Sequence, residues 1–259
     1  MPFVYGLLVP HGPDLLTLGQ GLFDGEGEKE KRVVSALQAV REKIRKISPD
    51  LIVSSSPHWM TQGFSIDASL NPKCIYDYHG FPSEFYNFNY SARNDLAMAA
   101  KILSASKESG IKAKLIERGM DHGHWIPLHF LSPNGSIPVV PISIAADTPE
   151  AHVAFGKAVA MAIGGKKAVF VAGGALLHRL DTISTMQRVP GGEAYLEEAI
   201  AKIERGEIEN IFGIDGYYEA APEGNLGTLM ELFGAMGARG KTLANEVIAG
   251  LSNTVMEFT

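Results

Sequence analysis

The chain has 259 residues, 46% of them hydrophobic, and a formal charge of −6, which fits one large α/β domain or at most two small ones. No basic stripe interleaved with aromatic residues is present, so nucleic acid is not expected as a partner. The single cysteine, Cys74, excludes an intramolecular disulfide and suits a cytoplasmic protein.

The N-terminal part of the chain has a strand–helix–strand pattern. Residues 3–9 form a short apolar run typical of a buried strand. The run is too short to span a bilayer and follows no basic segment, so we expect neither a signal peptide nor a membrane anchor. After a glycine-rich loop at 19–27, residues 28–47 show helical spacing of apolar side chains, and residues 51–55 resemble a second buried strand. This order predicts that the two strands pair in parallel.

Strand and helix patterns continue along the rest of the chain. Strands are expected at 64–70, 111–116, 137–144 and 168–172, and helices at 95–109, 149–163, 194–204 and 226–236. Residues 242–258 alternate weakly and predict one or two edge strands. No linker or repeat divides the chain, so the sequence predicts one α/β domain over residues 1–259, with a central mostly parallel or mixed sheet flanked by helices.

Three histidines occur in one recurring context. His11, His58 and His178 each follow a run that is predicted to be a buried strand, and parallel strand ends meet along one crevice where ligands bind. Imidazole is the commonest metal-binding side chain, and two histidines with one carboxylate form the iron site of many oxygenases. Alternatively, each histidine is a loop residue bonded to backbone carbonyls. The threefold recurrence favours a shared site.

Two further histidine motifs are present. In the run 121–128, His122 and His124 lie two residues apart and would share a metal if the backbone is extended. The alternative is a polar loop that caps a helix, with Asp121 at the N-cap. In the aromatic loop 76–82, His79 and its neighbours either wall a flat substrate or pack on the sheet, and packing is the expected fate of most rings.

Several common motifs are absent. The chain has no nucleoside-triphosphate loop, no Gly-x-Ser-x-Gly elbow, no His-Glu-x-x-His and no Cys-x-x-Cys. No Gly-x-Gly-x-x-Gly follows the first strand, so a dinucleotide cofactor is not expected.

The motifs in their order resemble one family. Pro10-His11, Ser56-Pro57-His58-Trp59, the loop 76–82, the run 121–128 and Gly174 to His178 are similar to the class III extradiol ring-cleavage dioxygenases. That family includes the protocatechuate 4,5-dioxygenase catalytic subunit, 2-aminophenol 1,6-dioxygenase and the DOPA extradiol dioxygenases. The resemblance implies a non-haem Fe(II) enzyme that opens a catechol-type or aminophenol ring with O2.

The resemblance also implies roles for individual residues. His11 and His58 match the two histidine ligands of Fe(II), His178 matches the catalytic acid–base histidine, and His122 matches a histidine close to the substrate and O2. The third ligand is expected just before or at the start of the last long helix.

Three glutamates compete for that third position. Glu223 is the choice, while Glu219 and Glu231 stay open. No histidine follows residue 178, so the histidine ligand of the DOPA branch is absent. The alternative for Glu223 is a surface carboxylate that favours a helix N-terminus.

Two other functions use the same residues. A zinc-dependent hydrolase would activate water with His11, His58 and Glu223, and a non-catalytic relative would keep the metal site alone. A purified sample could also hold Zn(II). The resemblance further implies a homo-oligomer, or a catalytic chain with a second subunit. Arg179 and Arg188 are candidates to pair with a substrate carboxylate, although arginine is more often a surface residue.

Overall fold

The fold is built on one eight-stranded sheet. The computed structural model describes residues 3–17, 26–185, 187–248 and 250–259, so most of the glycine-rich loop at 19–27 lies outside the described residues. The strands are β1 (Phe3–Val9), β2 (Leu51–Thr61), β3 (Phe64–Asp67), β4 (Ala113–Ile116), β5 (Val139–Ala145), β6 (Ala168–Gly173), β7 (Gly240–Ile248) and β8 (Leu251–Phe258). Their order across the sheet is β4-β3-β5-β2-β6-β1-β8-β7.

The centre of the sheet is parallel, and an antiparallel pair joins it to the outer strands on each side. Strand β2 pairs in parallel with β5 and β6, and β6 pairs in parallel with β1. Strands β3 and β8 run antiparallel to their inner neighbours β5 and β1. The mixed α/β sheet that the sequence predicts is therefore confirmed.

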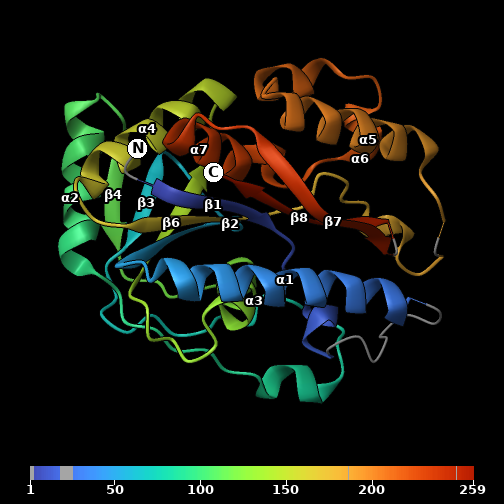
Figure 1. Ribbon diagram of the computed structural model, residues 1–259, viewed down its shortest axis with the longest axis horizontal. Helices are drawn as coiled ribbons and strands as arrows, with labels where there is room; N and C mark the ends of the chain where they lie inside the picture. Colours follow the sequence, from blue (N-terminus) through green and yellow to red (C-terminus); the bar gives the residue numbers. More distant parts are fainter. Residues whose placement is uncertain (1–2, 18–25, 186, 249) are drawn as a thin grey trace.

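Helices cover both faces of the sheet (Figure 1). The helices are α1 (Gly27–Ile47), α2 (Leu96–Glu108), α3 (His122–Leu131), α4 (Pro149–Ile163), α5 (Pro190–Arg205), α6 (Tyr217–Ala220) and α7 (Gly227–Met236). Figure 1 shows α1 and α3 below the sheet and α4 and α7 above it. In β6, Phe170 packs in the core on the α4 and α7 side, and its neighbours Val169 and Val171 pack on the opposite side. This alternation follows from the pleat of a strand that is buried on both faces.

The C-terminal strands differ from the expectation of weak edge strands. Strand β7 is an edge strand, but β8 lies between β1 and β7, and all of its residues except Leu251 are buried. Strand β8 is therefore part of the core layer, although its alternation in the sequence is weak. No helix in the described ranges is long and apolar enough to cross a membrane.

Three adjacent central strands bring the predicted histidines together. Strands β1, β6 and β2 are neighbours in the sheet, and the chain segments after β1 and β6 carry His11 and His178. His58 differs from the expectation because it lies within β2, which extends to Thr61. The pairing register of β2 with β5 shifts between Ser56 and Met60. Such an irregularity re-aims side chains, so His58 reaches the crevice from within a strand.

Candidate metal centre

Three ligand-capable atoms form a small triangle. The Nε2 atoms of His11 and His58 are 3.0 Å apart, and Oε1 of Glu223 lies 3.2 Å from the former and 3.0 Å from the latter. Ligands about 2.1 Å from one ion and at right angles to each other lie about 3.0 Å apart. The three atoms therefore fit one octahedral face of a divalent metal ion, with two nitrogen donors and one oxygen donor.

Local backbone structure holds Glu223 at this triangle. Its N–H donates to the carbonyl of Ala175, and the N–H of His178 donates to the carbonyl of Ala220, so the two segments are tied together. The next three residues, Gly224 to Leu226, all have positive φ angles, from 49° to 62°. Left-handed conformations at residues other than glycine cost about 1–3 kcal/mol each and cluster at functional sites. This costly turn sets the carboxylate against the histidines.

The charges at the triangle favour an ionised carboxylate. Burial alone would raise the pKa of Glu223, but His11, His58 and His178 together hold this pKa well below its usual range. Burial opposes charge on His58 as well, but hydrogen bonding and attraction to Glu223 raise the pKa of His58. The second carboxylate oxygen of Glu223, Oε2, is buried without a hydrogen-bond partner among the described residues. A cation at the triangle would satisfy the converging lone pairs, so the donor set fits a metal.

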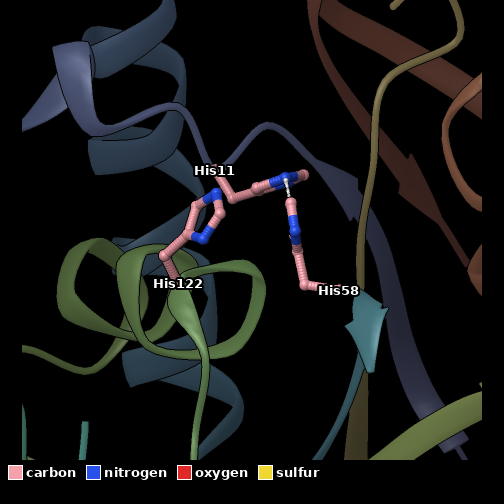
Figure 2. A group of neighbouring side chains, drawn as sticks. All are labelled: His11, His58 and His122. Carbon is pink, nitrogen blue, oxygen red and sulfur yellow. Dashed lines mark hydrogen bonds between the residues drawn. The ribbon is translucent and has the colours of Figure 1, made fainter. Parts of the chain in front are cut away.

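His122 lies beside the triangle and is held by Asp77. The rings of His11, His58 and His122 face one another from the end of β1, from β2 and from the start of α3 (Figure 2). Ligand atoms of these three residues lie within 4.8 Å of one another, so His122 is the rival of Glu223 as third ligand. Oδ1 of Asp77 accepts hydrogen bonds from the backbone N–H of His122 at 3.0 Å and from its Nδ1 at 2.8 Å.

The first turn of α3 can carry His122 to the crevice because of Gly123. A Cβ at Gly123 would lie 2.2 Å from Oγ of Ser56, so a side chain there would push the helix off β2. Asp121 occupies the N-cap position without capping the helix. Its carboxylate instead accepts hydrogen bonds from Ser56 at 2.5 Å and from Arg118 at 2.7 Å. The motif is therefore the start of a buried helix: Asp121 has the position that the second alternative predicts but makes no capping hydrogen bond, and the run is not a polar loop.

His178 lies on another side of Glu223. Its Nε2 is 3.5 Å from Oε1 of Glu223, and its side chain is 23% exposed. Burial lowers the pKa of His178, and Glu223 works against this. The ring thus reaches the triangle but is farther from Glu223 than the rings of His11 and His58 are.

All five predicted site residues line one cavity of about 380 Å³. The triangle and His122 form part of its wall, and His178 forms another part. The aromatic loop contributes Tyr78, His79 and Phe81, while its fourth ring, Tyr76, packs on Tyr78 and Trp125. The loop therefore both lines the cavity and packs against the rest of the protein, which are the two alternatives that the sequence left open. A cavity of this size suits a single aromatic ring with a short substituent.

The other predicted candidates lie away from the cavity. Glu219 is exposed, and Glu231 is fully buried and accepts a hydrogen bond from Oγ of Ser55 at 2.5 Å. His124 is buried with Nδ1 3.1 Å from Oγ of Ser54, and burial lowers its pKa to about 4. These three residues are not among those that line the cavity.

The buried Glu231 leads to a prediction about stability. Burial raises the pKa of Glu231 well above its ordinary value of 4.5, so folding favours the protonated form. The contribution of protonated Glu231 to the unfolding free energy is complete below pH 4.5. It is lost as the pH rises toward the folded-state pKa, by up to about 1.4 kcal/mol per pH unit. Glu231→Gln should therefore match the wild type in unfolding free energy at pH 4 and exceed it at pH 8. Denaturant unfolding at both pH values measures the difference, with the exposed Glu219→Gln as control. An equal change in both variants, or none, would contradict the pKa shift.

Two residues of the cavity have no clear signal in the sequence. Asp77 was apparent only as part of the aromatic loop, and Asp14 follows His11 by three positions without a motif. Asp77 is 45 positions away from its hydrogen-bond partner His122 in the sequence, and only the fold brings the two residues together. Asp14 would have been a candidate had the short turn after β1 been predicted to fold back over the strand end.

Comparisons with known proteins agree with this site. The family described as catalytic LigB subunit of aromatic ring-opening dioxygenase matches residues 5–256. The 4,5-DOPA dioxygenase extradiol of Beta vulgaris is 36% identical over 118 residues, which cover 45% of this chain and 44% of that protein. The 2-aminophenol 1,6-dioxygenase beta subunit of Pseudomonas sp is 28% identical over 205 residues, which cover 68% of this chain and 62% of that protein.

Each of these matches spans less than two thirds of the relative's length. Among solved structures, an uncharacterised protein of Escherichia coli K12 has the same fold, with a TM-score of 0.72 and 20% identity over 98% of this chain and 99% of that chain. Because the family match covers nearly the whole chain, this protein belongs to the LigB family of aromatic ring-opening dioxygenase catalytic subunits.

Proposed function

We propose that this protein is a non-haem Fe(II)-dependent extradiol dioxygenase that opens a catechol-type or aminophenol ring with O2. The observation that carries the proposal is the triangle of His11, His58 and Glu223 in the wall of a ring-sized cavity. Family membership and the relatives that act on DOPA and 2-aminophenol support the same chemistry. The catalytic domain would then comprise residues 1–259.

The three corners of the triangle would hold Fe(II). When bound, iron supplies Lewis acidity to adjacent ring heteroatoms and electrons for the reaction with O2. Glu223 contributes a negative charge that offsets part of the metal charge, and the two imidazoles bind as neutral donors through Nε2. The three residues share one side of the site, so the cavity side is available to the substrate and O2.

Proton transfer would fall to the histidines beside the triangle. His178 accepts a proton from a ring hydroxyl through Nε2 and returns it later to a departing oxygen, a role that suits a group with a pKa near neutrality. The carboxylate of Asp77 can only accept hydrogen bonds, so His122 donates through Nδ1. This arrangement fixes the His122 ring and leaves its Nε2 to hydrogen-bond the substrate or oxygen.

The setting of the enzyme is also proposed. The single half-buried Cys74 suits a reducing cytoplasm. The relative named as a beta subunit supports assembly with further chains, either copies of this chain or a second subunit.

A zinc-dependent hydrolase is the competing function for the same donor set. The test is anaerobic reconstitution with Fe(II), followed by O2 uptake with a panel of catechols and 2-aminophenol. Ester and amide hydrolysis by the Zn(II)-loaded protein is measured in parallel. We expect O2 uptake together with a yellow ring-opened product. Hydrolysis without O2 uptake would replace the proposal with the hydrolase, and iron binding without either reaction would indicate a non-catalytic relative.

Asp77 is expected to act as a positioning residue. Asp77→Ala removes the acceptor of both His122 hydrogen bonds, so kcat should fall about 10–100-fold, the usual effect of losing such a supporting partner. Iron content should stay close to the wild-type level, because Asp77 lies 3.6 Å from Nδ1 of His58, beyond hydrogen-bond distance. Asp77→Asn retains an acceptor oxygen and should recover part of the loss. Steady-state kinetics with metal analysis tests this, and an unchanged kcat in Asp77→Ala would exclude the role.

A further inference from the structure

The described part of the cavity wall contains no permanent cation. None of the described residues that line it is lysine or arginine, and none of the residues outside the described ranges is either. Outside the three proposed ligands, the side-chain nitrogen donors of the described lining are the imidazoles of His79, His122 and His178 and the amide of Asn253. A substrate carboxylate entering this cavity would therefore lose water without gaining a charged partner.

The two arginines that the sequence offers for this role are already engaged. Arg179 donates to both carboxylate oxygens of Asp181, at 2.6 and 2.7 Å, and to the carbonyl of Glu219. Arg188 forms an ion pair with Glu193. The two arginines that the sequence offered as carboxylate partners thus pair within the protein, and neither lines the cavity.

A buried carboxyl group lies in the wall instead. Asp14 is 6% exposed and lines the cavity, in the short turn that follows His11. Its charged neighbours are Glu30 and His11. The carboxyl group folds back over Gly12, where an added Cβ would lie 2.2 Å from its Oδ1. An acid at this position repels an anionic substituent and attracts an ammonium group.

The rest of the wall is apolar and aromatic. Tyr78 and Phe81 form one aromatic part, with ring centroids 5.4 Å apart, and Leu180, Ile183 and Leu251 contribute aliphatic surface. Such a wall suits the flat ring and an uncharged chain. The other carboxylate in the described wall away from the triangle, Asp77, is bonded to His122, so charge recognition away from the metal centre depends mainly on Asp14.

We propose that the cavity takes catechols or aminophenols whose ring substituent is uncharged or carries an amine, and that Asp14 is the specificity-determining residue that rejects a carboxylate. This inference rests on the proposed function, because it assumes that an aromatic ring occupies the cavity. It goes further by fixing the charge class of the substrate.

Three catechols with the same two-carbon spacer test the inference. Dopamine, 4-propylcatechol and 3,4-dihydroxyphenylpropionate end in an ammonium, a methyl and a carboxylate group respectively. Their dissociation constants are measured by calorimetry on the Zn(II)-loaded protein without O2, so that binding is read without turnover. The measurement is made at pH 8, above the pKa of about 7 that burial and Glu30 give Asp14. DOPA, which is dopamine with an added carboxylate, provides a second matched pair.

We expect dopamine to bind most tightly, 4-propylcatechol next and the carboxylate at least about tenfold more weakly than 4-propylcatechol, a difference of about 1.4 kcal/mol. Dopamine should likewise bind more tightly than DOPA. In Asp14→Asn, the preference for dopamine and the discrimination against the carboxylate should both shrink several-fold. Asp215→Asn, an exposed residue outside the cavity, changes the net charge equally and should leave the ranking unaltered.

A gain-of-charge variant tests the same idea if Asp14→Asn does not fold. Leu180 lines the cavity and is 57% exposed, so Leu180→Arg should be tolerated and should improve binding of the carboxylate relative to 4-propylcatechol.

The outcomes separate the inference from the function on which it rests. Equal or tighter binding of the carboxylate by the wild type, or an unchanged ranking in Asp14→Asn, would overturn the inference. If the binding data overturn the inference, ring opening of any of the three catechols by the Fe(II) enzyme would still support the proposed function. Failure of all three to bind would overturn both.

Discussion

Replacing His178 by alanine should abolish turnover while sparing the metal. His178 is the residue proposed to move the substrate proton, and general acid–base groups contribute about 10²–10⁴-fold to enzymatic rates. We expect kcat to fall by that factor. The backbone N–H of His178 still donates to Ala220 in the variant, so the tie that holds Glu223 is retained. Oxygen uptake by the Fe(II)-reconstituted variant measures the loss.

The control for this variant is His129→Ala. His129 is partly buried in α3 and packs against Phe88 and Phe130, away from the residues that line the cavity. The His129→Ala variant should therefore bind iron and turn over substrate as the wild type does. If His178→Ala loses iron as well as activity, His178 is a ligand and the assignment of Glu223 must be revised. If turnover persists, another residue moves the proton.

Removing the carboxylate of Glu223 should release the metal. Of the three glutamates that the sequence offers, Glu223 is the one at the triangle, since Glu219 is exposed and Glu231 bonds Ser55. Loss of a residue that merely supports a ligand lowers metal affinity about 10–100-fold, so loss of the ligand itself should exceed about 100-fold. Glu223→Ala should therefore bind Fe(II) and Zn(II) far more weakly than the wild type, as measured by competition with a chelator.

Three comparison variants make this result specific. Glu219→Ala and Glu231→Gln should keep wild-type affinity, because neither residue reaches the triangle. His122→Ala should keep most of the affinity and lose activity. The opposite pattern, with normal binding in Glu223→Ala and lost binding in His122→Ala, would show that the three histidines hold the metal.

The sequence predicts the parallel centre of the fold and its histidines well. Strands such as β6 are buried on both faces, so their apolar runs are continuous and easily recognised. The carboxyl ends of neighbouring parallel strands meet at one edge of the sheet. This rule predicts that His11 and His178, which follow two such strands, lie close together. His58 was found for the same reason, although it lies at an irregularity inside β2 rather than after the strand.

Other parts of the site depend on contacts distant in sequence. The sequence favoured Glu223 among three glutamates only through its place just ahead of the last helix, because the left-handed turn that positions Glu223 is revealed by no periodicity. Asp77 and Asp14 lie in short irregular segments, and their roles depend on how those segments fold over the strand ends. Strand β8 was underestimated because its polar residues, such as Thr254 and Glu257, are buried by β7 and α1.

The most direct test of the two-histidine, one-carboxylate site is anomalous diffraction from crystals loaded anaerobically with Fe(II). We expect one iron peak within bonding distance of Nε2 of His11, Nε2 of His58 and a carboxylate oxygen of Glu223. The side chains of His122 and His178 should lie beside this iron without binding it. An iron peak bound by His122 in place of Glu223, or a peak elsewhere in the molecule, would contradict the two-histidine, one-carboxylate site.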